Sequence, residues 1–135
     1  MKIVVAFAGF AALITAGSAA APFGTHSVPG TARVMVHCPE GGKEAFVTPP
    51  EVRIAVGDTV EWRTTGSVIT ESLAISLKND AQAWPFSGSV PRGRTSARSG
   101  RAATAGSYEY AVHLSCRRPG GGTDDVVIDP VIIIE

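Results

Sequence analysis

The chain has 135 residues, with 12 basic and 12 acidic side chains and a formal net charge of zero at pH 7 when histidine is neutral. This length corresponds to about one domain. The balanced charge gives no overall attraction to nucleic acid or to anionic lipid, so nucleic acid is not an expected partner.

The N-terminus has the three parts of a secretory signal peptide. Lys2 supplies the positive charge, residues 3–14 form a short apolar run, and small residues follow up to Ala20. Ser18 and Ala20 fit the −3 and −1 positions of a signal peptidase site, which predicts that residues 1–20 are removed. The apolar run is shorter than the roughly 20 residues of a membrane-spanning helix.

Cleavage after residue 20 would leave 11 basic and 12 acidic side chains, a formal net charge of −1. We expect a periplasmic or secreted protein that has no membrane span after the signal is removed. A flexible start at 21–30 would precede a single domain at 31–135.

Alternation of apolar and polar residues, which is typical of half-buried β-strands, recurs along this domain. Gly57-Asp58 is a tight hairpin signal, and Pro130 predicts a bulge or an edge position for the last strand. Val56 and Trp62 are expected to face the core. The pattern predicts strands at 33–38, 52–56, 59–63, 69–77, 107–116 and 126–134. Short strands between Gly- and Pro-rich turns favour an all-β sandwich or barrel.

Residues 78–106 are predicted to make a long surface excursion, and loops of this length are usually functional or disordered. This excursion contains an unusual basic run, and no acidic residue lies between Asp80 and Glu109. The run could hold an anionic ligand, a polysaccharide or a partner, or it could be a solvated loop kept soluble by its charge. Its arginines are Arg92, Arg94, Arg98 and Arg101.

Trp84 and Phe86 precede the arginine run. They either cap the open end of the sandwich or form an exposed aromatic contact patch, and capping is favoured. As a patch they would complete a candidate binding surface together with the four arginines.

The two cysteines, Cys38 and Cys116, fall at the alternating apolar positions of their predicted strands, which are expected to face inward. Each cysteine ends its predicted strand just before a turn. Two inward cysteines in an exported chain predict a disulfide that joins the two strand ends. The alternative is a metal site, since His37 and His113 lie close by in sequence and imidazole with thiolate suits copper or zinc. Strand geometry argues against that site because each histidine points away from its neighbouring cysteine.

The run FVTPPEVRIAVGDTVEW at 46–62 resembles the strand, Gly-Asp turn and Trp-ended strand of the cupredoxin family, which includes plastocyanin and azurin. The segment GSYEY at 106–110 is similar to the glycine-then-tyrosine strand that leads to the copper site in that family. The resemblance implies an all-β, cupredoxin-like Greek-key β-sandwich. It would also imply a blue-copper centre, which needs two imidazoles and a thiolate with a weak axial ligand.

The copper ligands of the family do not carry over onto this sequence. Glu71-Ser72 stands where the resemblance would place the first histidine, and 67–77 contains no histidine. Alanine or valine at 111–112 takes the place of the cysteine, and 117–135 contains neither histidine nor methionine. We therefore expect a cupredoxin-like fold without a type 1 copper centre and without another cofactor.

The sequence thus predicts a small exported domain that acts as a non-catalytic binding or structural module. An enzyme is not expected, because the chain has no Gly-x-Ser-x-Gly elbow and no recognisable triad. The expected partner is an extracytoplasmic protein or an anionic ligand, and the chain is expected to be a monomer. The alternative function is a copper-binding electron-transfer or metal-delivery protein with an atypical site made of His37, Cys38, His113 and Cys116.

Overall fold

The computed structural model describes residues 28–135, so the predicted signal peptide and most of the segment at 21–30 lie outside the described residues. Gly30 is already fixed to the domain, because its N–H donates to the Asp58 carboxylate at 2.8 Å and its carbonyl accepts from the Thr59 N–H at 3.0 Å. The first strand begins directly after it. No helix in the described part of the chain has the length and apolar character needed to cross a bilayer.

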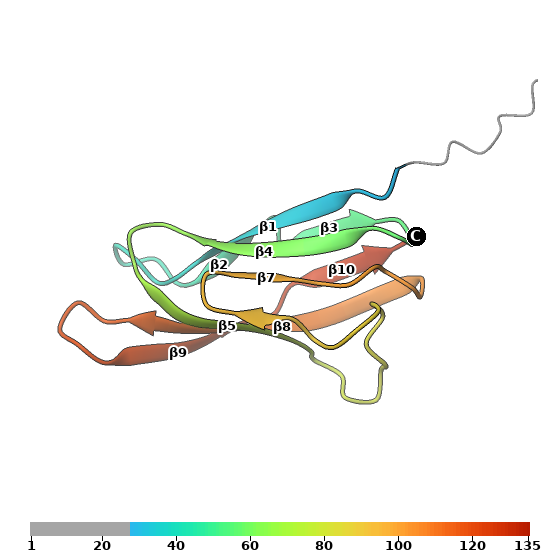
Figure 1. Ribbon diagram of the computed structural model, residues 1–135. Helices are drawn as coiled ribbons and strands as arrows, with labels where there is room; N and C mark the ends of the chain where they lie inside the picture. The colour runs from blue at the N-terminus through green and yellow to red at the C-terminus, as the bar shows by residue number, and fades with distance from the viewer. Residues whose placement is uncertain (1–27) are drawn as a thin grey trace, which may run out of the picture.

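The described residues form strands that pack as two sheets around one core (Figure 1). The four-stranded sheet has the order β2-β1-β4-β7, and the six-stranded sheet has the order β3-β10-β8-β5-β6 with β9 also beside β8. The strands are β1 (Thr31–His37), β2 (Phe46–Thr48), β3 (Glu51–Ile54), β4 (Thr59–Thr65), β5 (Thr70–Leu77), β6 (Arg92–Gly93), β7 (Ser96–Arg98), β8 (Gly106–Arg117), β9 (Thr123–Ile128) and β10 (Val131–Ile134).

The chain crosses between the sheets five times, from β2 to β3, β3 to β4, β4 to β5, β6 to β7 and β7 to β8. Pro49-Pro50 separates β2, which pairs with β1, from β3, which pairs with β10 in the other sheet. Proline supplies no backbone donor, so this pair of residues ends one ladder before the next begins. Two pairings are parallel, β1 with β4 and β3 with β10, and both join strands that are not consecutive in the chain. The predicted all-β Greek-key sandwich is therefore the architecture observed.

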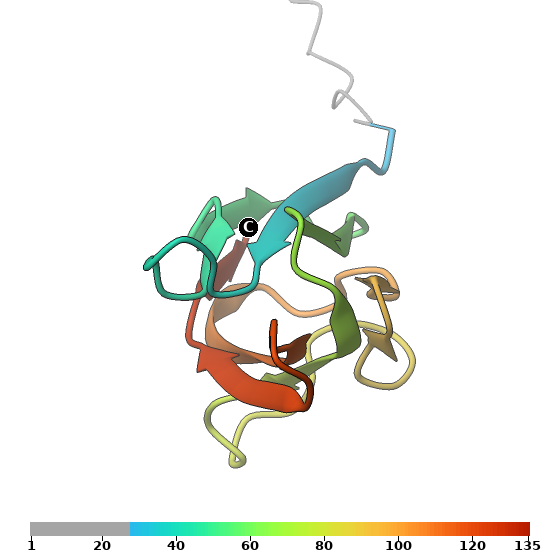
Figure 2. The same ribbon diagram turned by 90° about the vertical axis from the view of Figure 1, so that its left-hand side faces the viewer.

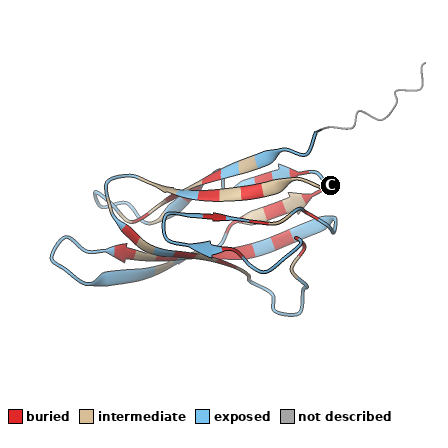
Figure 3. Cartoon of the chain, in the orientation of Figure 1, coloured by how far each residue is buried: buried red, intermediate tan, exposed pale blue. Residues whose placement is uncertain are grey.

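The core lies between the sheets and is filled by the inward residues of the alternating strands (Figure 3). On β8 the apolar parity predicted from the sequence is confirmed, since Tyr108, Tyr110, Val112, Leu114 and Cys116 are all buried. Trp62 is fully buried, as expected. The inward position expected for Val56 is wrong: its side chain is 53% exposed because β3 ends at Ile54 and the chain then turns.

Pro130 divides the last predicted strand into two, β9 and β10, which pair with successive stretches of β8. The interruption was expected, but β10 is not an edge strand, because it lies between β3 and β8. Pro130 has no N–H to give to a ladder, and it lies in the junction between β9 and β10. Its carbonyl accepts a bond from the Tyr110 N–H at 3.0 Å. The long strand β8 therefore pairs with both β9 and β10.

The excursion at 78–106 is tied back to the sandwich. It contains the short strands β6 and β7, which form edges of the six-stranded and four-stranded sheets. The Ser87 N–H donates to the Arg101 carbonyl at 2.9 Å, and the Ala103 N–H donates to the Pro85 carbonyl at 2.7 Å. This segment closes one side of the sandwich between the two sheet edges.

Candidate functional site

One end of the sandwich collects the connections at 38–45, 66–69 and 118–122, and Figure 2 looks onto this end. The predicted disulfide lies here. Cys38 directly follows β1 and Cys116 lies near the end of β8, and their sulfurs are bonded at 2.03 Å with the Cα atoms 6.0 Å apart. Both residues are buried. The disulfide therefore joins the four-stranded sheet to the six-stranded sheet beneath the loops.

Thr70 and Glu71 begin β5 beside the disulfide. Thr70 is buried, and its hydroxyl lies 3.5 Å from the Cys38 sulfur. Glu71 forms ion pairs with Arg117 and, at 3.6 Å, with Arg94. Where the cupredoxin resemblance would place a histidine ligand, at Glu71-Ser72, this chain thus has a carboxylate held by two arginines and an exposed hydroxyl.

The position of the family's cysteine ligand lies inside the core. Ala111 and Val112 are both buried, and β8 continues beyond them to Arg117 instead of turning into a ligand loop. Neither side chain can donate to a metal.

The two histidines of the alternative copper site lie on strands of different sheets. His37, on β1, stacks on Phe46 with ring centroids 4.1 Å apart and an interplanar angle of 9°. His113, on β8, is exposed, and its Nε2 is 2.9 Å from the Ser76 hydroxyl.

A copper ion does not fit this donor set. Both sulfurs are bonded to each other, so the predicted His/Cys ligand set supplies no thiolate. Over the described range 28–135, no group of three or more His, Cys, Asp and Glu residues is arranged to hold a metal ion. Blue-copper coordination needs two imidazoles and a thiolate together, and that alternative ligand set is not formed here.

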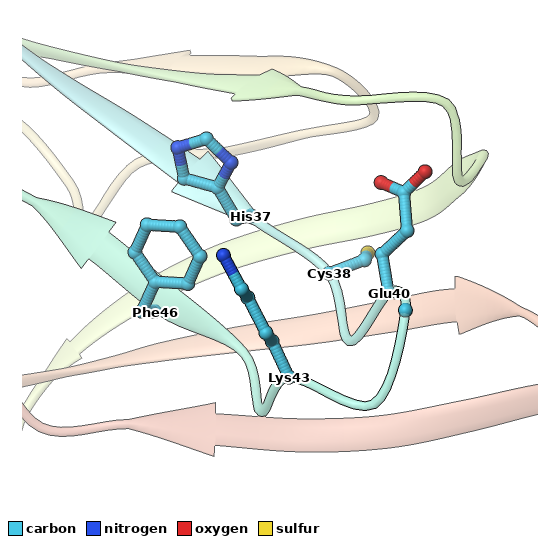
Figure 4. A pocket seen from close by; sticks show the side chains of 6 residues that line it. His37, Cys38, Glu40, Lys43 and Phe46 are labelled. Atoms are coloured by element: carbon cyan, nitrogen blue, oxygen red, sulfur yellow. The ribbon is translucent and has the colours of Figure 1, made fainter.

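A shallow pocket of about 350 Å³ opens beside Cys38 (Figure 4). The stacked rings of His37 and Phe46 form one wall, and the Lys43 side chain extends toward the Phe46 ring. The Glu40 carboxylate points away from Lys43 and binds the Ser67 hydroxyl in the turn after β4. The accessible part of the pocket is therefore aromatic and cationic.

The structure places the four arginines of the predicted binding surface in different surroundings. Arg92, on β6, is exposed at the edge of the six-stranded sheet, and Arg94 is paired with Glu71. Arg98, on β7, belongs to the four-stranded sheet and donates to the Thr31 hydroxyl at 2.9 Å. Arg101 is exposed in the loop after β7. They are close together in sequence, but Arg92 and Arg98 belong to different sheets.

The aromatic pair of the predicted surface packs inward. Phe86 is 4% exposed and belongs to the core, and Trp84 packs against it with ring centroids 5.1 Å apart. An exposed patch containing the Phe86 ring is therefore wrong, because the bridge between Phe86 and Ala102 holds this segment against the sandwich. The pair covers the core, which was the favoured interpretation.

Two arginines that the sequence pattern did not single out lie beside Arg98. In the β1-β4-β7 ladder, Arg33 pairs with Glu61 and Glu61 pairs with Arg98, while Arg63 lies two residues further along β4. Their outward parity could have been inferred from the sequence, because each alternates with buried neighbours. Their proximity could not, since it depends on which strands pair.

No protein-family model matches the chain, and no sequence among the curated proteins matches it. Solved structures of cupredoxins are similar to it. A purple cupredoxin from Nitrosopumilus maritimus is 21% identical, with 77% of this chain and 99% of that chain covered and a TM-score of 0.44. Amicyanin from Paracoccus versutus is 22% identical, with 76% and 81% covered and a TM-score of 0.36. At these identities and TM-scores the two likenesses assign the chain no family and no role, and its all-β sandwich rests on the strand pairing described above.

Proposed function

We propose that this protein is an exported, non-catalytic binding domain in which a disulfide takes the place of the metal centre at one end of a cupredoxin-like sandwich. Its partner would be extracytoplasmic, and it would need no cofactor. The observation that carries the proposal is the Cys38–Cys116 disulfide, because it uses both cysteines of the sequence and leaves no thiolate.

Two further features support this proposal. The positions that the resemblance would assign to the first histidine and the cysteine hold no metal ligand of that kind: Glu71 pairs with two arginines, and Val112 fills the core. A buried disulfide also suits an oxidising compartment outside the cytoplasm. Export and removal of residues 1–20 remain predictions of the signal pattern.

Copper titration tests the proposed function. Protein purified in the oxidised form should give no thiolate-to-copper charge-transfer absorption when Cu(II) is added. A strong band at one copper per chain would contradict the proposal and favour electron transfer or metal delivery. The Cys38→Ala/Cys116→Ala variant is the control, because a copper site elsewhere on the surface would still bind in it without a thiolate band.

A further inference from the structure

Charge is sorted between the two sheets, although the whole chain is neutral. The strands of the four-stranded sheet carry three arginines and one glutamate, a surplus of two positive charges. The strands of the six-stranded sheet carry five carboxylates and three arginines, a surplus of two negative charges. The four-stranded sheet is therefore cationic and the six-stranded sheet anionic, although the formal net charge of the chain is zero.

The cationic residues of the four-stranded sheet lie on its outer face. Val34, Val60 and Ala97 are buried, so their strand neighbours point to the solvent side of the sheet. Arg33, Glu61 and Arg98 form one row across β1, β4 and β7, and neighbouring strands are about 4.8 Å apart. Arg33 and Arg98 therefore flank Glu61 with roughly 10 Å between their backbones.

The single carboxylate on this face does not neutralise it. Glu61 is ion-paired with Arg63, and its side chain is only 13% exposed. Within the described residues, Arg33 and Arg98 form no ion pair, and Arg98 instead donates to the Thr31 hydroxyl. Two exposed guanidinium groups on a flat strand surface remain available for an anionic ligand.

The same face continues into an aromatic platform. His37 lies four residues along β1 from Arg33, pairs in register with Phe46, and stacks on its ring. Phe46 is 41% exposed, and Lys43 lines the pocket beside both rings. Hydroxyl side chains occupy other outward positions of these strands, at Thr31, Thr48, Thr59, Thr65 and Ser96.

We infer that the outer face of the four-stranded sheet, defined by Arg33, Arg63, Arg98, His37 and Phe46, binds an acidic polysaccharide. This inference rests on the proposed binding function and names its surface and its ligand class. Guanidinium groups pair with the carboxylate or sulfate groups of the polymer. The Phe46 ring packs against the apolar C–H side of a sugar, and the strand hydroxyls exchange hydrogen bonds with sugar hydroxyls.

An acidic polypeptide is less well matched to this face. A basic patch alone would suit either polymer, but the exposed aromatic platform and the hydroxyl rows suit a ring that carries hydroxyls as well as charge. The surface is also an open sheet face, along which an extended chain can run across successive rows.

The test measures binding of the full chain, purified from an oxidising compartment, to immobilised polymers at about 50 mM and about 500 mM salt, because screening separates charge pairing from packing. The probes are polygalacturonate and dextran sulfate as carboxylated and sulfated polysaccharides, neutral dextran, and polyglutamate as the acidic polypeptide. Polygalacturonate or dextran sulfate should bind and weaken with salt, and neutral dextran should not bind.

Matched variants locate the surface. Arg33→Gln/Arg98→Gln should weaken polysaccharide binding about tenfold or more. Arg53→Gln/Arg92→Gln removes the same charge from the six-stranded sheet and should change binding less than about twofold. Phe46→Ala should weaken binding to the polysaccharide but not to polyglutamate.

Three results would overturn the inference: equal losses in the two double variants, polyglutamate binding as tight as polysaccharide binding with no effect of Phe46→Ala, or no polysaccharide binding at low salt. None of these results would give a copper band, so failure of this surface assignment is distinguishable from failure of the proposed function.

Discussion

Trp62 and Tyr110 join the two sheets through the centre of the core. The indole N–H of Trp62 on β4 donates to the hydroxyl of Tyr110 on β8 at 3.1 Å, and the rings meet edge to face with centroids 5.8 Å apart. Both side chains are fully buried. The contact combines edge-to-face aromatic packing with a hydrogen bond that satisfies the buried indole N–H. It therefore stabilises the packing of the two sheets on each other.

This contact predicts a loss of stability at alkaline pH. Burial raises the pKa of Tyr110 to about 12, against the opposing effect of its bond to Trp62, while the unfolded value is 10.0. Between these values the unfolded chain releases the phenolic proton and the folded chain retains it. Tyr110 therefore contributes full stability below pH 10 and loses about 2–3 kcal/mol as pH rises to 12.

Urea unfolding of the wild type and Tyr110→Phe from pH 7 to pH 11.5 measures this effect. At pH 7 the variant should be less stable by about 1–3 kcal/mol, because the Trp62 N–H loses its buried partner. The difference should shrink as pH rises above 10. A constant difference across this range would show that the phenol does not titrate differently in the two states.

The disulfide should be a large contributor to stability. It closes a sequence separation of 78 residues and joins the two sheets at their loop end. Cys38→Ala/Cys116→Ala should reduce the free energy of unfolding by about 2–5 kcal/mol. The measurement is urea unfolding of both proteins, with the wild type also unfolded under reducing conditions as the control. A reduced wild type as stable as the oxidised protein would contradict this expectation.

Much of the fold could be predicted because the strands have one buried face. On β8 every second residue is apolar, which was enough to place Tyr110 and Cys116 in the core and to predict the disulfide. The error at Val56 came from a strand that ends two residues before its apolar pattern does. Local periodicity shows which residues are inward, but hydrogen bonding decides where a strand ends.

The close approach of β6 and β7 predicts a requirement for glycine at position 93. A Cβ atom built on Gly93 would lie 1.8 Å from the Ser96 carbonyl oxygen, a backbone atom that cannot move independently. Gly93→Ala should therefore destabilise the domain by about 1–3 kcal/mol. Gly120→Ala, where a Cβ meets no atom within 4 Å, is the matched control and should be nearly neutral in thermal unfolding. Equal stability of the two variants would refute the steric argument.

Glu61 offers a gain-of-binding test of the outer face. The hydrogen bond from Arg63 holds the pKa of this carboxyl below its ordinary value, so it is ionised at neutral pH. Glu61→Gln removes the only carboxylate from the strands of the four-stranded sheet and should tighten polygalacturonate binding several-fold at low salt. Glu109→Gln, on the six-stranded sheet, is the control for total charge. Tightening of the same size in both variants would mean that net charge, and not this face, controls binding.

The candidate surface was harder to predict than the fold. Arg92, Arg94, Arg98 and Arg101 stand out because they are close in sequence, yet the chain passes from one sheet to the other within that run. Arg33 and Arg98 are 65 positions apart in the chain and come to flank Glu61 only through the parallel pairing of β1 with β4 and the edge position of β7. The face of a strand on which a residue lies can be predicted from the residues next to it. The order of the strands in a sheet depends on pairings between distant parts of the chain.

Metal content and thiol count together test whether the Cys38–Cys116 disulfide stands in place of a blue-copper centre, as proposed. The full chain is purified from an oxidising compartment with copper and zinc supplied. Metal is measured per chain, and alkylation before reduction counts free thiols by intact mass. Our expectation is no stoichiometric metal and no alkylated cysteine. One metal per chain together with two free thiols would contradict it, because Cys38 and Cys116 would then be ligands instead of a disulfide.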